Sequence, residues 1–270
     1  MQYSPHEYQA FATNFILEHP IAAVLLDMGL GKSVITLTAI EEMMHDRFEV
    51  SKVLVIAPLR VATNTWPTEI KKWDHLKDIT YSVAVGTETE RKAALTAKAD
   101  IYIINRENVQ WLIEKSGIPF DFDMIVIDEL SSFKSNQAKR FKSLVKMRPR
   151  VKRIVGLTGT PSSNGLMDLW AEFRLLDMGG AARKIHRAIP QGVFMPDKRN
   201  GDIIYSYKPL PGAEEAIYKR IGDITISMRS KDYLKMPECV INEVPVRMEP
   251  HQKDLYEQLK QEMVISLKGS

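Results

Sequence analysis

Five short runs of apolar residues, rich in valine and isoleucine, recur along the first 160 residues of the chain. Each run is nearly continuous rather than alternating with polar residues, which is typical of strands buried on both faces of a parallel sheet. The runs cover residues 22–26, 53–58, 101–104, 124–128 and 153–158.

Helical patterns, in which apolar residues recur every three or four positions, separate these runs. Strands and helices that alternate at this spacing predict an α/β fold with a doubly wound, mostly parallel sheet. Ligands of such sheets bind at the carboxyl ends of the strands, so a functional site is expected there. The helical patterns cover residues 34–44, 65–73, 87–97, 107–115, 136–146 and 166–176.

The pattern changes after residue 178. Residues 179–212 hold two adjacent glycines, several prolines and a basic cluster, which predicts loops and short helices, an insertion or linker rather than sheet. Helical patterns return at 213–221 and 250–264, and 244–248 has the pattern of an edge strand. We therefore divide the chain into an α/β lobe at 1–178, a helical and loop-rich appendage at 179–243, and a closing strand with a bridging helix at 244–270.

The composition is that of an ordinary globular protein, with 44% hydrophobic and 26% charged residues among 270. The 37 basic and 34 acidic residues leave a net charge of +3, which argues neither for nor against a nucleic-acid partner. The single cysteine, Cys239, excludes an internal disulfide framework and suits a reducing compartment. No apolar run is long enough to cross a membrane, and the N-terminus lacks a signal-peptide pattern. We therefore expect a cytoplasmic or nucleoid-associated protein without membrane contact.

A glycine-bearing turn joins the first apolar run to the first helical pattern. Strand, turn and helix, with Lys32-Ser33 opening the helix, is the context that a phosphate-binding P-loop requires. Backbone N–H groups and the helix N-terminus bind phosphate, the lysine reaches the β- and γ-phosphates, and the serine hydroxyl joins a Mg²⁺ shell. The full pattern has glycine where this chain has Leu26, so this stretch alone also fits an ordinary strand–turn–helix. The expected nucleotide-binding residues are Asp27, Gly29, Leu30, Gly31, Lys32 and Ser33.

Two further polar groups follow later strands. Asp128 and Glu129 end the fourth run as in a Walker B element, in which the aspartate holds Mg²⁺ and the glutamate polarises the attacking water. Thr158 and Thr160 flank a glycine after the fifth run, where their hydroxyls can reach the carboxylates and relay the nucleotide state. Taken singly, the first pair also fits a surface turn and the second a turn that caps the next helix. Since both groups share a sheet edge with the P-loop, we expect Glu129 and Lys32 to be catalytic.

Four motifs are spaced along the α/β lobe: Asp-Met-Gly-Leu-Gly-Lys-Ser at 27–33, Ala-Pro-Leu at 57–59 with Trp66 and Trp73, Ile-Asp-Glu at 127–129, and Leu-Thr-Gly-Thr-Pro at 157–161 with Asn164, Leu169 and Trp170. Together they resemble the first RecA-like lobe of superfamily-two helicases, and most of all the Swi/Snf group of DNA translocases. The resemblance extends over nearly the whole chain. It implies a RecA-like P-loop NTPase fold, ATP and Mg²⁺ as cofactors, and sequence-independent binding of DNA, with duplex favoured over single strands.

The resemblance also implies roles for individual residues. Gln9 corresponds to the glutamine that reads the adenine edge, although the residue taken alone favours an exposed helix position. Arg60, Asn105 and Lys134 lie near stretches that contact a nucleic-acid strand. The hydroxyls of Thr158 and Thr160, already placed near the carboxylates, couple the ATP state to the grip on DNA.

The chain departs from the family pattern in three places. Leu26 stands where the family has an acidic residue, and Leu130-Ser131 stands where glycine or alanine and then histidine are common. Nothing after residue 180 resembles the second RecA-like lobe with its arginine finger. We therefore expect the chain to be an N-terminal fragment or one subunit of a split motor, and to bind ATP·Mg²⁺ weakly and hydrolyse it poorly.

Two other classes of protein fit parts of this pattern. A degenerate RecA-like module would hold DNA or a protein without hydrolysis; the departures favour it, and the intact Lys32, Ser33, Asp128 and Glu129 oppose it. A P-loop kinase or metabolic ATPase fits less well, because such an enzyme has no use for a hydroxyl relay behind its carboxylate pair.

Overall fold

The computed structural model describes residues 1–133, 138–159, 166–177, 194–200, 203–233 and 248–262. The chain forms two compact units, Met1–Leu234 and Lys235–Ser270. In the second unit the described element is the helix α11, Pro250–Glu262. The other described helices and strands belong to the first unit.

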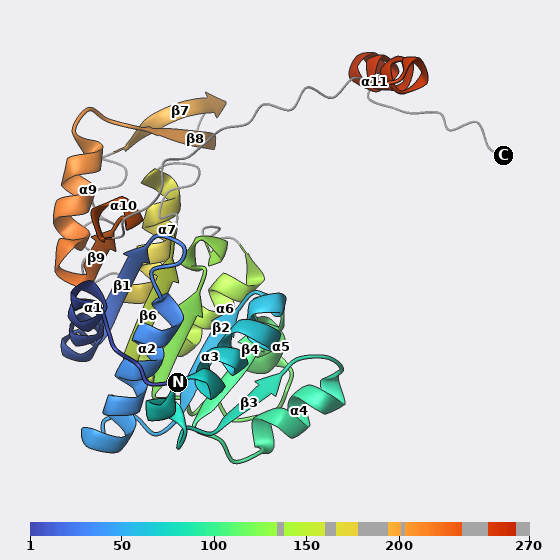
Figure 1. The fold of residues 1–270 in the computed structure, drawn as a ribbon. Coiled ribbons are helices and arrows are strands. Elements are labelled where there is room, and N and C mark those ends of the chain that lie inside the picture. Colours follow the sequence, from blue (N-terminus) through green and yellow to red (C-terminus); the bar gives the residue numbers. More distant parts are fainter. Residues whose placement is uncertain (134–137, 160–165, 178–193, 201–202, 234–247, 263–270) are drawn as a thin grey trace. The chain divides into compact units, whose positions relative to one another are not determined.

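A seven-stranded parallel sheet forms the centre of the first unit (Figure 1). Its strand order is β3-β4-β2-β5-β6-β1-β9, so the chain crosses to the other half of the sheet after β1 and returns after β4. Every pairing in it is parallel. The strands are β1 Ile21–Leu26, β2 Val53–Ala57, β3 Tyr81–Ala84, β4 Ile101–Asn105, β5 Met124–Asp128, β6 Arg153–Thr158 and β9 Thr225–Met228.

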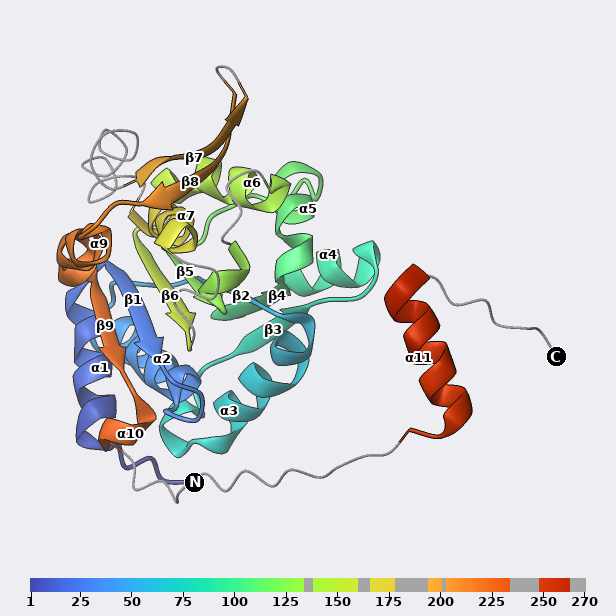
Figure 2. The same ribbon diagram turned by 90° about the horizontal axis from the view of Figure 1, so that it is seen from above.

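Helices cover both faces of this sheet (Figures 1 and 2). α1, α2 and α3 contribute to one core, and α4, α5, α6, α7 and α9 contribute to the other. Successive residues of a strand enter opposite cores: Val53 and Val55 pack with the first group of helices, and Leu54 and Ile56 with the second. Burial on both faces is why the strands read as unbroken apolar runs. The helices are α1 Glu7–Glu18, α2 Lys32–Glu41, α3 Trp66–Lys72, α4 Glu88–Thr96, α5 Val109–Glu114, α6 Lys139–Met147, α7 Leu166–Asp177, α9 Ala213–Ile221 and α10 Ser230–Tyr233.

The predicted α/β fold with a doubly wound parallel sheet is confirmed, and each of the five apolar runs is a strand. Two strands, β3 and β9, are not predicted by the apolar runs. β3 is only partly buried along most of its length, and in β9 the exposed Ser227 separates the buried Ile226 and Met228. Short strands at the sheet edges bury one face or less, so they lack the continuous apolar signal of the central strands.

A β-hairpin lies within residues 179–212, where the sequence pattern predicts loops and short helices rather than sheet. That prediction is wrong for the hairpin because its first strand carries Pro196 and several charges, which an isolated two-stranded ribbon tolerates. The pairing is antiparallel and its register shifts on both sides of Lys198. Residues 178–193 and 244–247, the latter most of the predicted edge strand, lie outside the described residues. The hairpin strands are β7 Phe194–Asn200 and β8 Ile203–Pro209.

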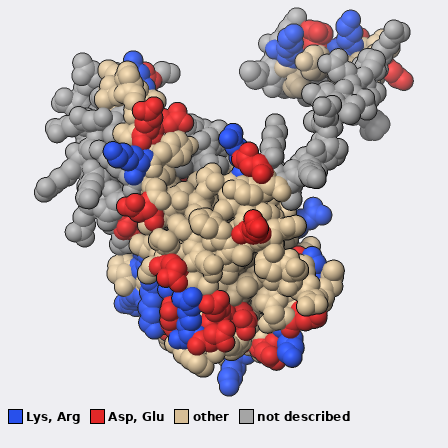
Figure 3. Space-filling model, turned by 60° about the vertical axis from the view of Figure 1, so that its left-hand side comes forward, with Lys and Arg blue, Asp and Glu red and all other residues tan. Residues whose placement is uncertain are grey.

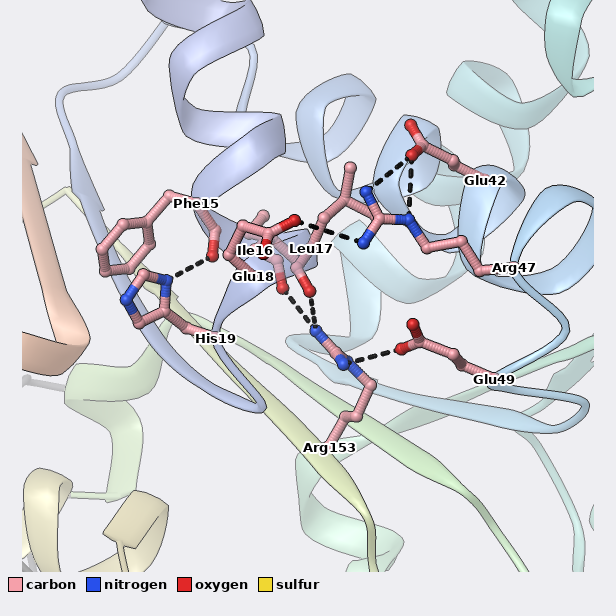
Figure 4. A network of polar contacts seen from close by, with 9 residues as sticks. All are labelled: Phe15, Ile16, Leu17, Glu18, His19, Glu42, Arg47, Glu49 and Arg153. Atoms are coloured by element: carbon pink, nitrogen blue, oxygen red, sulfur yellow. Dashed lines mark hydrogen bonds and ion pairs between the residues drawn. The ribbon is translucent and has the colours of Figure 1, made fainter.

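A buried arginine at the amino end of β6 anchors α1 (Figure 4). Arg153 donates from Nη2 to the carbonyl oxygens of Ile16, at 2.7 Å, and Leu17, at 2.6 Å. Its Nη1 donates to Glu49 at 2.9 Å. The two carbonyls belong to the last turn of α1, where a helix leaves its carbonyl groups without internal partners. Arg153 therefore supplies hydrogen-bond donors to two carbonyl groups at the end of a helix that lies 137 and 136 residues earlier in the chain.

On the face shown in Figure 3, the described basic and acidic side chains are interspersed and much of the remaining surface is uncharged. Charges of mixed sign give this face no strong field of one sign. Among the described helices, none is both long enough and apolar enough to cross a membrane.

Candidate nucleotide site

The carboxyl ends of three neighbouring strands bring most of the predicted residues together. β5, β6 and β1 are consecutive in the sheet, and the register pairs Leu25 with Thr158 and Asp128 with Leu157. The P-loop therefore starts beside the end of β6, which in turn lies beside Asp128. Thr160 and Lys134, predicted to couple ATP state and to approach DNA, lie outside the described residues.

Two glycines give the P-loop its backbone path. Gly29 and Gly31 have φ angles of 85° and 81°, in the left-handed region that glycine occupies without strain. Gly31 immediately precedes α2, which begins at Lys32. A Cβ at Gly31 would lie 2.7 Å from Nε2 of Gln9, so a larger residue there would displace the side chain through which α1 meets the loop. The turn thus presents the N-terminus of α2 at the sheet edge, as a phosphate site requires.

Lys32 lies over its own loop. Its Nζ donates to the carbonyl oxygens of Leu26 at 2.7 Å and Asp27 at 3.1 Å. Burial lowers the pKa of Lys32, while the charges of Asp128, Glu129 and Asp27 act to raise it. The ammonium group therefore interacts electrostatically with the carboxylates of the site while it is held by two carbonyl groups of its own loop.

Asp128 accepts a hydrogen bond from a tryptophan of α3. The indole Nε1 of Trp66 donates to Oδ2 of Asp128 at 2.8 Å. Burial raises the pKa of Asp128, and the indole hydrogen bond acts against that effect. The sequence pattern marks Trp66 as part of a motif but gives no sign of this contact, because 62 residues separate the two positions.

The donors available for Mg²⁺ are oxygens, which this ion prefers. Ser33 occupies the first turn of α2, and Asp128 ends β5. Among the described residues, no group of three or more His, Cys, Asp or Glu side chains has an arrangement that could hold a metal ion by itself. One carboxylate and one hydroxyl suit a Mg²⁺ ion that is held mainly by substrate phosphates and water.

Glu129 has a left-handed backbone conformation, and its carboxylate accepts two hydrogen bonds. Its φ angle of 61° places a non-glycine residue in the left-handed region, a strain that structures retain mostly at functional sites. Its Oε1 accepts a hydrogen bond from Thr158 Oγ1 at 3.0 Å and another from the hydroxyl of Ser131. The predicted contact between Thr158 and the carboxylate pair is therefore present. Ser131, which replaces the family's histidine, supplies a second contact that the sequence pattern does not predict.

Gln9 connects α1 to the P-loop. Its Oε1 accepts a hydrogen bond from the backbone N–H of His6 at 3.0 Å, and its Nε2 donates to the carbonyl oxygen of Leu30 at 3.4 Å. Gln9 is buried rather than exposed, with 8% of its surface accessible. The side chain of Leu30 packs in the core, so this residue faces the site only through its backbone.

A cavity of about 930 Å³ opens beside the P-loop. Its volume lies near the upper end of the range for small-molecule sites. Gln9 and the P-loop form one part of its wall, and the segment that leads into α3 forms another. The sequence pattern does not predict the contribution of the first four residues, of which Tyr3 stacks on His75 with ring centroids 5.0 Å apart. The P-loop lining consists of Met28, Gly29, Gly31, Lys32 and Ser33, and the opposite lining includes Val61, Thr65, Glu69, Lys72 and Trp73.

Of two residues predicted to approach DNA, Asn105 ends β4 and Arg60 follows the neighbouring strand β2. β2 pairs with β4, and the register sets Ala57 beside Asn105. Arg60, three residues beyond Ala57, is exposed. Asn105 is buried and bonds through its side chain to Glu107 at 3.0 Å and Asn108 at 2.5 Å. Of the two, Arg60 presents a cationic side chain to solvent at this edge, whereas Asn105 is engaged within its own loop.

The parallel sheet, the P-loop and the carboxylate pair at one edge define a RecA-like lobe of the P-loop NTPase class. The chain belongs to the SNF2-related domain family, whose model matches residues 8–270. That match covers the P-loop, the Asp128-Glu129 pair and the segment around Thr158.

Three comparisons illustrate the relationship. Putative protein p41 of Acyrthosiphon pisum secondary endosymbiont phage 1 is 33% identical over 271 residues, covering 98% of this chain and 59% of that protein. The ISWI chromatin-remodeling complex ATPase ISW1 of Saccharomyces cerevisiae is 29% identical over 179 residues, covering 63% of this chain and 15% of that protein. The SWI2/SNF2 ATPase core of Sulfolobus solfataricus, solved in complex with dsDNA, superposes with a TM-score of 0.65 at 20% identity, covering 99% of this chain and 55% of that one. The chain thus spans less than two thirds of the length of these relatives.

Proposed function

We propose that the chain is the ATP-binding lobe of an ATP-dependent DNA translocase. The observation that carries the proposal is the convergence of Lys32, Asp128, Glu129 and Thr158 at one edge of the sheet. Membership of the SNF2-related family supports ATP as the nucleotide, and the relative solved with dsDNA supports duplex DNA as the partner.

Each residue of the site has a part in this function. The N-terminus of α2 and Lys32 bind the phosphate chain, and Gln9 faces the cavity where the base would lie. Ser33 and Asp128 would hold Mg²⁺, which neutralises charge on the phosphates when bound. Glu129 orients the attacking water and accepts its proton, because its carboxylate is fixed through one oxygen by two hydroxyls.

The proposed coupling to DNA runs through Thr158. Its hydroxyl bonds directly to the catalytic carboxylate, and the chain beyond it leads toward Thr160. Arg60, exposed at the same edge, is proposed to contact a DNA phosphate. Such contacts fix position without reading sequence, so binding is expected to weaken steeply with salt.

A second RecA-like lobe is proposed to complete the cycle. The relatives extend well beyond the matched length, since the chain covers 59% of p41 and 55% of the Sulfolobus ATPase core. An arginine finger from another lobe contributes about 10³ to 10⁵ in turnover in related nucleotide hydrolases. Turnover by the 270-residue chain alone is therefore expected to be slow.

The proposal is tested by measuring nucleotide binding and ATP hydrolysis with and without linear duplex DNA. Lys32→Ala should abolish nucleotide binding, and Glu129→Gln should retain binding but lose hydrolysis. Binding of DNA by a chain that binds no nucleotide would refute the proposal and establish the alternative, a RecA-like module without ATP chemistry.

A further inference from the structure

Trp66 is the first residue of α3 and is completely buried. Its indole N–H reaches Oδ2 of Asp128 at 2.8 Å. An indole nitrogen can only donate, so this bond stabilises the carboxylate in its ionised form and fixes one of its two oxygens. A backbone hydrogen bond from Glu129 also stabilises the ionised carboxylate.

The same segment forms a wall of the nucleotide cavity. Thr65, directly before Trp66, lines the cavity, and so does Glu69 one turn later. Trp66 itself packs in the core between this wall and the sheet. Trp66 therefore connects the segment that lines the cavity with Asp128, the carboxylate that is expected to hold the metal.

A second tryptophan near the cavity does not share this arrangement. Trp73 donates to Glu69 at 2.8 Å, which is a contact within one turn of the same segment. The bond from Trp66 instead joins two elements 62 residues apart in the chain, α3 and the end of β5. A local contact shapes only its own helix, whereas the bond from Trp66 sets the position of one element relative to another.

We propose that Trp66 is a positioning residue that orients Asp128 for Mg²⁺ and joins the wall of the nucleotide cavity to this metal ligand. The inference rests on the proposed function, because it requires that Asp128 bind the Mg²⁺ that accompanies the nucleotide. Groups that hold a metal ligand in place affect metal affinity by roughly 10- to 100-fold when removed.

The test is a Mg²⁺ titration of nucleotide binding, followed with a fluorescent ATP analogue. Trp66→Phe should raise the Mg²⁺ concentration for half-maximal binding roughly 10- to 100-fold. Binding of the analogue in EDTA should be unchanged, because Lys32 and the P-loop backbone remain. The matched control is Trp111→Phe, the same change in α5, where Trp111 packs with the other core and against Arg91 at 4.1 Å; its titration should match the wild type.

A second variant removes the donor without removing volume. Benzothienylalanine, installed at position 66, keeps the shape of the two fused rings but has sulfur in place of N–H. This variant should show the same rise in the Mg²⁺ concentration for half-maximal binding, with a thermal unfolding midpoint close to that of the wild type. It keeps the test possible if Trp66→Phe does not fold.

The outcomes separate the two proposals. A wild-type chain that binds nucleotide with Mg²⁺, together with a benzothienylalanine variant of unchanged Mg²⁺ dependence, would overturn the role of Trp66 alone. A wild-type chain without Mg²⁺-dependent nucleotide binding would overturn the proposed function, and this inference with it.

Discussion

The anchor that Arg153 provides for α1 can be tested by removing its guanidinium group. Arg153→Met keeps an unbranched, flexible side chain of similar length but has no donors. The carbonyl groups of Ile16 and Leu17 then lose hydrogen bonds of 2.7 and 2.6 Å at a buried position. A buried polar group left without a partner costs about 1–3 kcal/mol. Two such groups give an expected loss of about 2–5 kcal/mol in the free energy of unfolding, since methionine refills part of the volume.

Urea unfolding followed by circular dichroism measures this loss. With a slope of about 2 kcal/mol/M, the midpoint should fall by about 1–2.5 M. The midpoint of Arg153→Lys should lie between those of the wild type and Arg153→Met, because one ammonium group cannot reproduce the planar guanidinium that donates to both carbonyl groups.

Arg47 provides the matched control (Figure 4). It donates to Glu42 at 3.0 Å and to Glu18 at 3.3 Å, but these partners are other side chains at the surface, not helix-end carbonyls. Arg47→Met should leave the midpoint nearly unchanged, since exposed ion pairs contribute little. Equal midpoints for the Arg153→Met and Arg47→Met variants would refute the reasoning that the buried helix end depends on Arg153.

Three further predictions concern other parts of the lobe. Ser131→Ala removes one of the two hydroxyls that fix Glu129, so the rate of ATP hydrolysis should fall while nucleotide affinity is kept; an unchanged rate in a single-turnover assay would contradict this. Burial acts to raise the pKa of Asp123, but hydrogen bonds from Lys152 and a serine lower it to about 2, below its ordinary value. The stability that Asp123 contributes is therefore present above about pH 4 and is lost as the pH falls toward 2. Asp123→Asn should destabilise the protein at pH 7 and have little effect near pH 2. Equal unfolding midpoints of the wild type and Asp123→Asn at pH 7 would exclude this contribution. Gly31→Ala places a side chain at a φ of 81° and brings its methyl against a glutamine amide, so unfolding should require about 1–2 kcal/mol less and nucleotide affinity should fall. Wild-type affinity in isothermal titration calorimetry would rule out the second effect.

The central strands and their functional ends could be predicted because both signals are local. Burial on two faces requires an unbroken apolar run in the sequence. The functional residues directly follow the runs that form β1 and β5, so their place at the strand ends could be predicted as well. The left-handed turns at Gly29 and Gly31 were likewise predictable, since only glycine takes such conformations freely.

The remaining parts of the site depend on contacts between distant residues. Trp66 and Asp128, and Arg153 and Ile16, lie 62 and 137 residues apart, and no periodic pattern records such pairs. The hydrogen bond from Ser131 to Glu129 spans two residues, yet it depends on the positive φ of Glu129, which sequence preferences disfavour for this residue type.

The strand β9 has a consequence for how the lobe is made during synthesis. β1, which leads into the P-loop, pairs with β9 along its outer edge, and the N–H of Asp27 donates to the carbonyl oxygen of Met228 at 3.3 Å. A ribosome that adds 5–20 residues per second needs roughly 10–40 s to travel the intervening chain. During that interval the strand that leads into the nucleotide site presents an unpaired edge, which is a template for pairing with other chains. Formation of β9 ends that exposure, because β9 pairs in parallel with β1 from Ala23 to Leu26.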